Sequence, residues 1–311
     1  MDTAQIVLLA VFGTVVAGMF ILDVGILHRK AHVVQFREAT LWVIAWVSLA
    51  MLFNLFVFLL MGAESGGEFL AAYVIELSLS VDNVFVFAVV FAYFAIPREY
   101  QHRVLFWGIL GAIIMRGIMI VGGIALLEAL HWMVFVFGAF LVFTAIKMAT
   151  QKEGDVDPEK NLVVRLFRRF MPVHDGFEGQ RFFVKRNGRT YATLLFLALL
   201  VIESTDLLFA IDSVPAVLAI STDLFIVYTS NLFAIAGLRS LYFVVAGSLG
   251  RFHFLKYGLA GVLLFVGFKM LASEWYHVPV PISLGVIVLV IGGSVVASLL
   301  IKNKSAEAAH P

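Results

Sequence analysis

Nine long apolar stretches constrain this chain more than any other feature. Most of them approach or exceed the roughly 20 residues that an α-helix needs to cross a bilayer. Only helices satisfy every backbone group within one such segment, and no alternating pattern indicates a barrel. The sequence therefore predicts an all-α, polytopic membrane helix bundle of about nine transmembrane helices. The expected spans are residues 6–27, 41–61, 69–94, 104–127, 133–148, 190–220, 225–248, 257–272 and 281–301.

Composition excludes a water-soluble globular protein. The chain is 62% hydrophobic and 14% charged, whereas globular domains are roughly 45–50% apolar and about 25% charged. Such a chain cannot bury its apolar surface by folding on itself, so its partner is the lipid bilayer. It contains no cysteine, which excludes a disulfide framework and thiolate ligands. Nothing in it indicates binding of nucleic acid.

The positive charges alternate between loops. Of the 22 Lys and Arg residues, eighteen lie in the loops after the first, third, fifth, seventh and ninth expected spans. The intervening loops contain none. Because positive loops are retained in the cytoplasm, the amino terminus is expected outside and the carboxyl terminus inside. This predicts a multi-pass protein of the bacterial inner (cytoplasmic) membrane.

An internal repeat spans the third to fifth and the sixth to eighth expected spans. In each copy an acid is followed after five residues by a second acid and a small polar residue, then by an arginine in the next span and a lysine in the one after that. The matched positions are Glu76 with Asp206, Asp82 with Asp212, Asn83 with Ser213, Arg116 with Arg239, and Lys147 with Lys269. Three matching intervals in the same order make coincidence a poor explanation.

Each copy contains three helices, so the second copy enters the membrane from the opposite face. Inverted repeats are typical of secondary transporters, whose substrate sites lie near the midplane where the two halves meet. The predicted organisation is two flanking helices (1–67), a first three-helix repeat (68–150), a cytoplasmic basic loop (151–189), a second inverted repeat (190–273), and a last helix with a cytoplasmic tail (274–311). The basic loop predicts a short amphipathic helix near 162–170 and a hairpin turn at Asn187-Gly188.

The acids within the spans are the candidate functional residues. Each charge at the centre of a membrane helix costs roughly 2.5 to 3.5 kcal/mol unless it is paired. One interpretation is that Arg116 and Arg239 simply neutralise acids in structural pairs. The acids outnumber these bases, however, which favours a cation site with the arginines as partners. The acids are Glu76, Asp82, Glu203, Asp206 and Asp212.

Residues six apart on an ideal helix lie about 240° apart and do not both face one ligand. Pro215 therefore predicts a kink in the sixth span, and a broken helix would bring carbonyls and carboxylates around one point. Carboxylate, amide and hydroxyl oxygens suit hard cations such as Mg²⁺, Ca²⁺ or Mn²⁺. The predicted metal ligands are Glu76, Asp82, Asn83, Glu203, Asp206 and Asp212, supported by Ser80, Ser213, Arg116, Arg239, Lys147 and Lys269.

The segments 75–83 and 203–216 resemble the paired signature segments of the TerC family, and 229–239 and 182–188 extend the likeness over nearly the whole chain. The sequence is most similar to the Alx-type branch, within the broader LysE-like transporter group. The resemblance implies a membrane protein linked to Mn²⁺ export, with Glu76, Asp82, Asn83, Glu203, Asp206 and Asp212 as its functional residues. The family name comes from tellurium resistance.

Two functions follow as hypotheses. The first is a divalent metal transporter that exports Mn²⁺ by alternating access, with Mn²⁺ expected ahead of Ca²⁺ or Mg²⁺ and protons as a candidate coupling ion. The alternative is an accessory membrane protein that delivers metal to secreted enzymes or organises a metal or tellurite stress complex. An enzyme is not expected, because the sequence has no nucleophile–base constellation, phosphate-binding glycine loop or cofactor motif.

Overall fold

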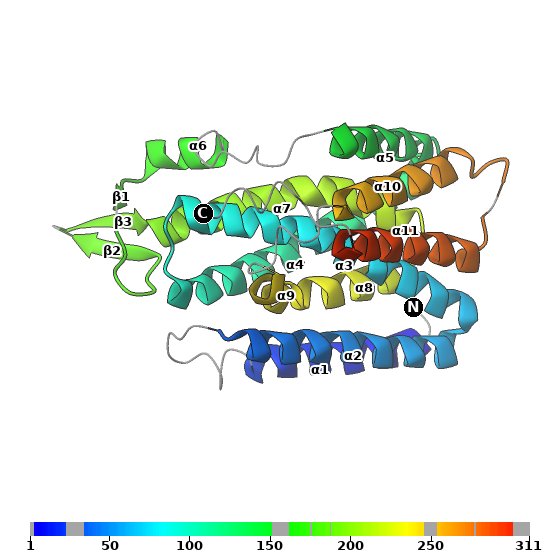
Figure 1. Ribbon diagram of the computed structural model, residues 1–311, viewed down its shortest axis with the longest axis horizontal. Helices are drawn as coiled ribbons and strands as arrows, with labels where there is room; N and C mark the ends of the chain where they lie inside the picture. Colours follow the sequence, from blue (N-terminus) through cyan, green and yellow to red (C-terminus); the bar gives the residue numbers. More distant parts are fainter. Residues whose placement is uncertain are drawn as a thin grey trace.

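The computed structural model describes residues 3–22, 34–150, 162–174, 176–186, 188–245, 254–276 and 278–300, leaving out the side chains of residues 3, 4, 9, 19–22, 82 and 85. The elements, in chain order, are α1 (Thr3–Leu22), α2 (Phe36–Met61), α3 (Ala63–Tyr93), α4 (Arg98–Ala129), α5 (Met133–Thr150), α6 (Leu162–Phe170), β1 (Val173–His174), β2 (Phe183–Arg186), β3 (Arg189–Thr193), α7 (Leu194–Leu218), α8 (Leu224–Ala236), α9 (Leu238–Val245), α10 (Leu255–Leu271) and α11 (Val280–Leu300). Long helices dominate, as expected for an all-α membrane bundle (Figure 1).

Seven segments of the described chain are long and apolar enough to cross a bilayer: α2, α3, α4, α5, α7, α8 with α9, and α11. In α1 the apolar stretch Gln5–Gly18 is shorter, and α10 has 17 residues. A polytopic helical membrane protein is therefore confirmed, whereas the predicted count of nine spans is not.

Local chemistry sets where several helices begin. Gly62 separates α2 from α3 at φ 99°, a conformation that residues with a side chain rarely adopt. Asp223 caps α8, because its Oδ1 accepts from the backbone N–H of Phe225 at 2.8 Å, which satisfies a donor that a helix start leaves free. Pro97 immediately precedes α4 and fixes the entry of the chain into that helix.

The two three-helix units pack in opposite directions. The end of α3 (Phe91 and Phe94) shares a cluster of buried side chains with the start of α7 (Leu195 and Leu197). The start of α3, by contrast, clusters with the end of α7. The pairing is also reciprocal, since α3 packs on α8 while α7 packs on α4. This arrangement is what an inverted repeat predicts.

The third helix of each unit crosses its counterpart at a pair of glycines. An added Cβ on Gly138 of α5 would lie 3.0 Å from the carbonyl oxygen of Gly267, and one on Gly267 of α10 would lie 2.9 Å from that of Gly138. Only residues without a side chain permit this approach. The crossing therefore fixes how the outer helices of the two units meet.

Neither helix that carries the predicted signature acids is interrupted. α3 is continuous over 31 residues, and α7 continues through Pro215 to Leu218. The expected broken helix in the sixth span is wrong, because α7 runs through Pro215 and the Ala219 N–H donates to Pro215 O at 3.0 Å. The interruption instead falls at Gly237, between α8 and α9.

A small sheet covers one end of the bundle (left in Figure 1). Its strand order is β1-β3-β2, with β1 parallel and β2 antiparallel to β3. The predicted hairpin is present, with Gly188 at φ 75° in its turn, while Asn187 is outside the described residues. The start of α4 lies at this end, where the guanidinium carbon of Arg103 is 5.3 Å from the Phe182 ring centroid.

Candidate metal centre

A polar face runs along each of the two central helices. Glu76, Ser80 and Asn83 occupy positions i, i+4 and i+7 of α3, so they share one face. Asp206 and Ser213 share a face of α7 in the same way. All five are almost fully buried, with 0 to 4% of their surface exposed. The two faces meet where the Asn83 amide Nδ2 donates to Asp206 Oδ1 at 3.1 Å.

Arg116 of α4 lies between these faces. Its Nη2 donates to Asp206 Oδ1 at 3.1 Å and its Nε to Asp206 Oδ2 at 3.4 Å. Its Nη1 donates to Ser213 Oγ at 3.2 Å and forms an ion pair with Glu76 Oε1. One guanidinium group, 2% exposed, therefore joins the matched acids of the two repeats.

Several oxygens around Arg116 have no hydrogen-bond partner among the described residues. They are Ser80 Oγ, Asn83 Oδ1 and the second carboxylate oxygen of Glu76, Oε2. A buried polar atom without a partner costs free energy and is rare in native proteins. The three are hydroxyl, amide and carboxylate oxygens, and hard divalent cations prefer such ligands.

Glu203 lies close to this cluster but is not part of it. It precedes Asp206 by three residues on α7 and makes no hydrogen bond or ion pair within the described part of the chain. Its carboxylate sits against Gly111 of α4, where any Cβ would collide with it. A side chain at position 111 would displace the Glu203 carboxylate, so glycine leaves room for the position that the carboxylate occupies.

Asp212 occupies a different environment. It follows Asp206 by six residues and faces α5, where it accepts a hydrogen bond from Thr144 Oγ1 at 3.2 Å. Asp212 is half-buried, and Lys147, one turn beyond Thr144, is exposed. The continuous helix therefore separates the two acids of the repeat onto different faces.

The remaining predicted residues are Asp82, Arg239 and Lys269. The side chain of Asp82 is not among those described, although its backbone belongs to α3. Arg239 is buried in the first turn of α9, and Lys269 is half-buried in the last turn of α10. Among the described residues, no three His, Cys, Asp or Glu residues are grouped as a metal site. Among the predicted ligands whose side chains are described, Glu76, Asn83 and Asp206 share the central cluster, whereas Glu203 and Asp212 lie apart from it.

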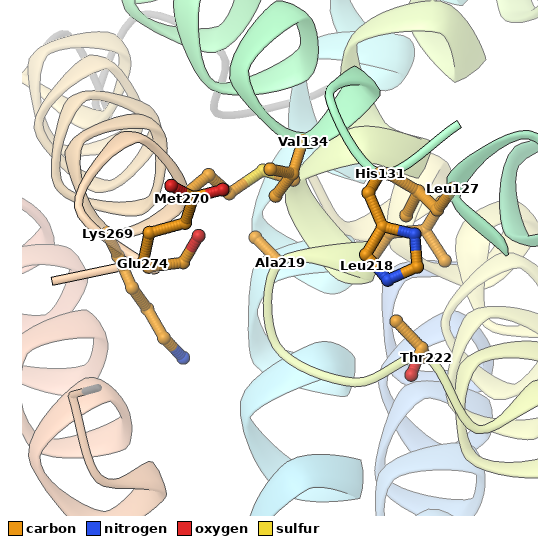
Figure 2. A pocket seen from close by; sticks show the side chains of 10 residues that line it. Leu127, His131, Val134, Leu218, Ala219, Thr222, Lys269, Met270 and Glu274 are labelled. Atoms are coloured by element: carbon orange, nitrogen blue, oxygen red, sulfur yellow. The ribbon is translucent and has the colours of Figure 1, made fainter. Parts of the chain in front are cut away.

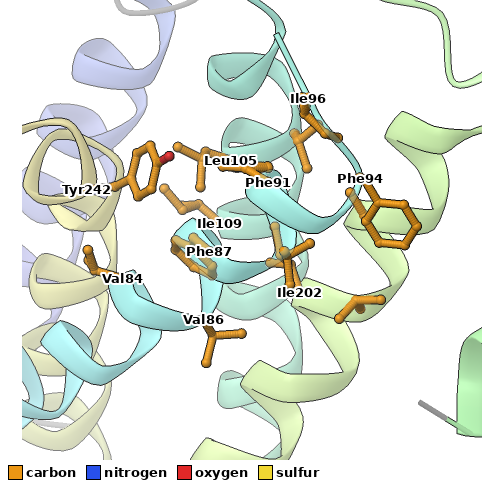
Figure 3. Close-up of a cluster of buried hydrophobic side chains, with 14 of the residues drawn as sticks. Val84, Val86, Phe87, Phe91, Phe94, Ile96, Leu105, Ile109, Ile202 and Tyr242 are labelled. Carbon is orange, nitrogen blue, oxygen red and sulfur yellow. The ribbon is translucent and has the colours of Figure 1, made fainter. Parts of the chain in front are cut away.

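Apolar layers enclose the cluster at both ends. On the side of the sheet, Phe87 and Phe91 of α3 pack around Tyr242 of α9 (Figure 3), and the Phe91 and Tyr242 ring centroids are 5.4 Å apart. Tyr242 donates from its hydroxyl to Gln101 Oε1 at 3.0 Å. A second cluster, which contains Ile75 and Val214, lies toward the opposite end. The central cluster therefore lies between two clusters of buried apolar side chains.

A cavity of about 310 Å³ opens at the end opposite the sheet (Figure 2). Its wall includes Leu218 at the end of α7, Thr222 after that helix, His131 before α5, and Lys269 and Glu274 at the end of α10. Glu68 lies nearby and accepts a hydrogen bond from Ser221 Oγ at 2.7 Å. None of the residues of the central cluster lines this cavity.

The sequence pattern alone did not identify two contributors to this region. Thr144 and Gly111 both lie inside segments of the repeat, but nothing in the sequence distinguishes a glycine that packs on lipid from one that packs on a carboxylate. Ser80 and Ser213 were expected as supporting residues, and the structure places both beside the central acids. Their spacing of four and seven residues from Glu76 and Asp206 was the available signal.

Comparison with known proteins gives consistent matches over most of the chain. Residues 61–306 match the profile described as "Integral membrane protein TerC family". An uncharacterized membrane protein of Myxococcus xanthus is 50% identical over 92% of this chain and 89% of its own length. Proteins named "Putative membrane-bound redox modulator Alx" are 46% identical in Salmonella typhi and 45% identical in Escherichia coli K12, each over 89% of this chain and 88% or 89% of their own length. No solved structure matches the chain.

Proposed function

Because the chain belongs to the integral membrane protein TerC family, we propose that it is a divalent metal cation transporter that exports Mn²⁺ across the bacterial inner membrane. The amino terminus is outside and the carboxyl terminus inside. The observation that carries the proposal is the set of unpartnered oxygens on Ser80, Asn83 and Glu76 beside Asp206. They are hard ligands in a chain that has no cysteine.

Position supports this choice over a purely structural cluster. Glu76 and Asp206 are matched acids from the two units, and they meet near the middle of long apolar helices. Transporters with inverted repeats commonly bind their substrates at such a point. Arg116 neutralises one of the two acids, but it leaves acceptor oxygens that a structural ion pair would not need.

Alternating access is the proposed mechanism. In the conformation described, apolar layers separate the central cluster from both ends, so an ion cannot pass without a rearrangement. The antiparallel packing of α3 and α7 gives the two units equivalent but oppositely directed contacts. Rocking of one unit against the other would open the cluster to one side at a time. Protons are the proposed coupling ion, exchanged for the metal at the carboxylates.

The name of the Alx relatives refers to redox modulation. The present chain contains no cysteine, so its own side chains offer no thiol chemistry for such a role. Export of a redox-active metal such as manganese would be compatible with a role in redox modulation. The alternative of an accessory protein for metal delivery has its support in the basic sheet end, where Arg165, Arg168 and Arg169 of α6 are exposed.

The test is ion flux in proteoliposomes that contain the purified protein. We expect saturable flux of Mn²⁺, compared with Ca²⁺, Mg²⁺ and Zn²⁺, and its loss in Asp206→Asn. Glu128→Gln is the matched control, because Glu128 is an exposed carboxylate in the last turn of α4. Absence of flux for every ion in the wild-type protein would overturn the proposal and favour the accessory role.

A further inference from the structure

Arg116 occupies the position at which a bound cation would satisfy the central acids. Its guanidinium uses both oxygens of Asp206, one of Glu76 and the hydroxyl of Ser213. A metal ion and the guanidinium cannot hold these oxygens at the same time. With Arg116 in place, two carboxylates and one guanidinium sum to a charge of −1. A divalent ion in place of the guanidinium would bring the sum to zero.

A second acceptor lies within reach of Arg116. Glu203 has no hydrogen bond or ion pair in the described part of the chain. It precedes Asp206 by three residues on α7. Gly111, which lies against the Glu203 carboxylate, precedes Arg116 by five residues on α4. Both helices start at the end of the bundle near the sheet. Glu203 therefore lies about 4.5 Å closer to the sheet than Asp206 along α7, and Gly111 about 7.5 Å closer than Arg116 along α4. An arginine side chain is long enough to move from the Asp206 carboxylate to the Glu203 carboxylate.

We propose that Arg116 is a tethered counter-ion that exchanges places with the transported cation, lying between Glu76 and Asp206 in the empty carrier and moving to Glu203 when a divalent ion binds. The inference rests on the proposed function, since it concerns the same cation site. Gly111 keeps the Glu203 carboxylate positioned to receive the guanidinium.

The exchange gives the empty carrier a physical means of returning. Buried carboxylates without a partner are strongly unfavourable in a membrane. Arg116 pairs with Glu76 and Asp206 when no ion is present, and the ion pairs with them when it is bound. The protein can therefore change conformation in both states. Without Arg116, the empty carrier would have to move unpaired charges, whereas the loaded carrier would be little affected.

Two modes of transport distinguish the movement of the empty carrier from that of the loaded carrier. Net efflux of radioactive Mn²⁺ into metal-free buffer requires the empty carrier to return, but exchange of internal for external Mn²⁺ does not. In Arg116→Gln we expect net efflux to fall by about tenfold or more while exchange stays within about threefold of wild type. Arg116→Lys should restore part of the net efflux. Arg168→Gln, a change of an exposed arginine on α6, should leave both modes unchanged.

Loss of both modes together, or of neither, in Arg116→Gln would overturn the proposal. A second variant keeps the test decisive if Arg116→Gln does not fold. Glu203→Gln leaves the contacts of Arg116 with Glu76 and Asp206 intact but removes the acceptor to which it moves. Equilibrium Mn²⁺ binding to the purified Glu203→Gln protein should weaken by about tenfold, because the guanidinium then competes more strongly with the ion.

The double variant Arg116→Gln with Glu203→Gln distinguishes this role of Glu203 from direct ligation. If Glu203 acts by receiving Arg116, the double variant should bind Mn²⁺ as tightly as Arg116→Gln does. Equal weakening by Glu203→Gln in both backgrounds would show that Glu203 is a ligand and would overturn the exchange. Failure of the proposed function is distinct, since the wild-type protein itself would then neither bind nor carry Mn²⁺.

Discussion

Asp206 and Asp212 lie six residues apart on one continuous helix and meet opposite surroundings. Asp206 is 4% exposed and bonded to Arg116 and Asn83. Asp212 is half-buried and accepts a hydrogen bond from Thr144, a neutral hydroxyl. The repeat matches each acid with a counterpart in α3, yet the rotation of the helix gives only one of them a central position. A shared motif therefore does not imply a shared role.

The largest effect should come from Asp206. Asp206→Asn removes the negative charge of Asp206 and one of its two acceptor oxygens, so a bound divalent ion would lack one of its two compensating carboxylates. Removing one partner of a buried charge pair typically costs about 3–5 kcal/mol. We expect Mn²⁺ flux in proteoliposomes to fall by about a hundredfold or more. Asp212→Asn, measured in parallel, is the comparison. Equal losses in the two variants would contradict the distinction between the two positions.

Gly111→Ala tests the position of the Glu203 carboxylate without changing any charge. The added methyl group would displace the Glu203 carboxylate from the position it occupies against α4. We expect Mn²⁺ flux to fall by about tenfold, with little change in protein yield. Gly122→Ala is the control, because an added Cβ there meets nothing within 4 Å. The same flux in both alanine variants would argue against a role for Glu203.

Asp212 should be more tolerant. Asp212→Asn keeps the shape of the side chain and a hydrogen-bond acceptor for Thr144, so we expect flux to fall by only about threefold to fivefold. Thr144→Val removes the hydrogen bond that Asp212 accepts and should give a loss of similar size. If Asp212→Asn abolished flux while Thr144→Val left it unchanged, Asp212 would have to contact the ion directly.

The smallest predicted effect concerns the aromatic layer above the centre. Tyr242→Phe keeps the ring packed against Phe91 but removes the hydrogen bond to Gln101. The free energy of unfolding should fall by about 1 kcal/mol, measured by denaturation of the purified protein in detergent. Mn²⁺ affinity should stay as in wild type, because Tyr242 does not contact the central oxygens. A change in affinity would extend the site into this layer.

Sequence alone identified most of the architecture but not the composition of the centre. Apolar length and the position of charges predicted a polytopic helical bundle, because the bilayer imposes both. Acids in apolar segments identified the candidate residues, since such acids are costly without a function. The expected break at Pro215 is absent, because α7 continues through the proline to Leu218 and the packing of the helix keeps it intact despite the missing donor.

Which acids share a site depended on packing that the sequence does not specify. The helical angle between Asp206 and Asp212 excluded a common face, but it did not say which acid points inward. That choice follows from the position of α4, which brings Arg116 to Asp206, and of α5, which brings Thr144 to Asp212. The close approach of Gly111 to Glu203 likewise requires the packing of α4 on α7.

The central claim is that the oxygens of Glu76, Asn83 and Asp206 bind the cation. Its most direct test is equilibrium Mn²⁺ binding to purified protein. Binding is measured as the loss of the electron paramagnetic resonance signal of free aqueous Mn²⁺. The account predicts binding in the wild type and in Asp212→Asn, and affinity weaker by about a hundredfold in Asp206→Asn. Wild-type affinity in Asp206→Asn, or no Mn²⁺ binding by the wild type, would contradict it.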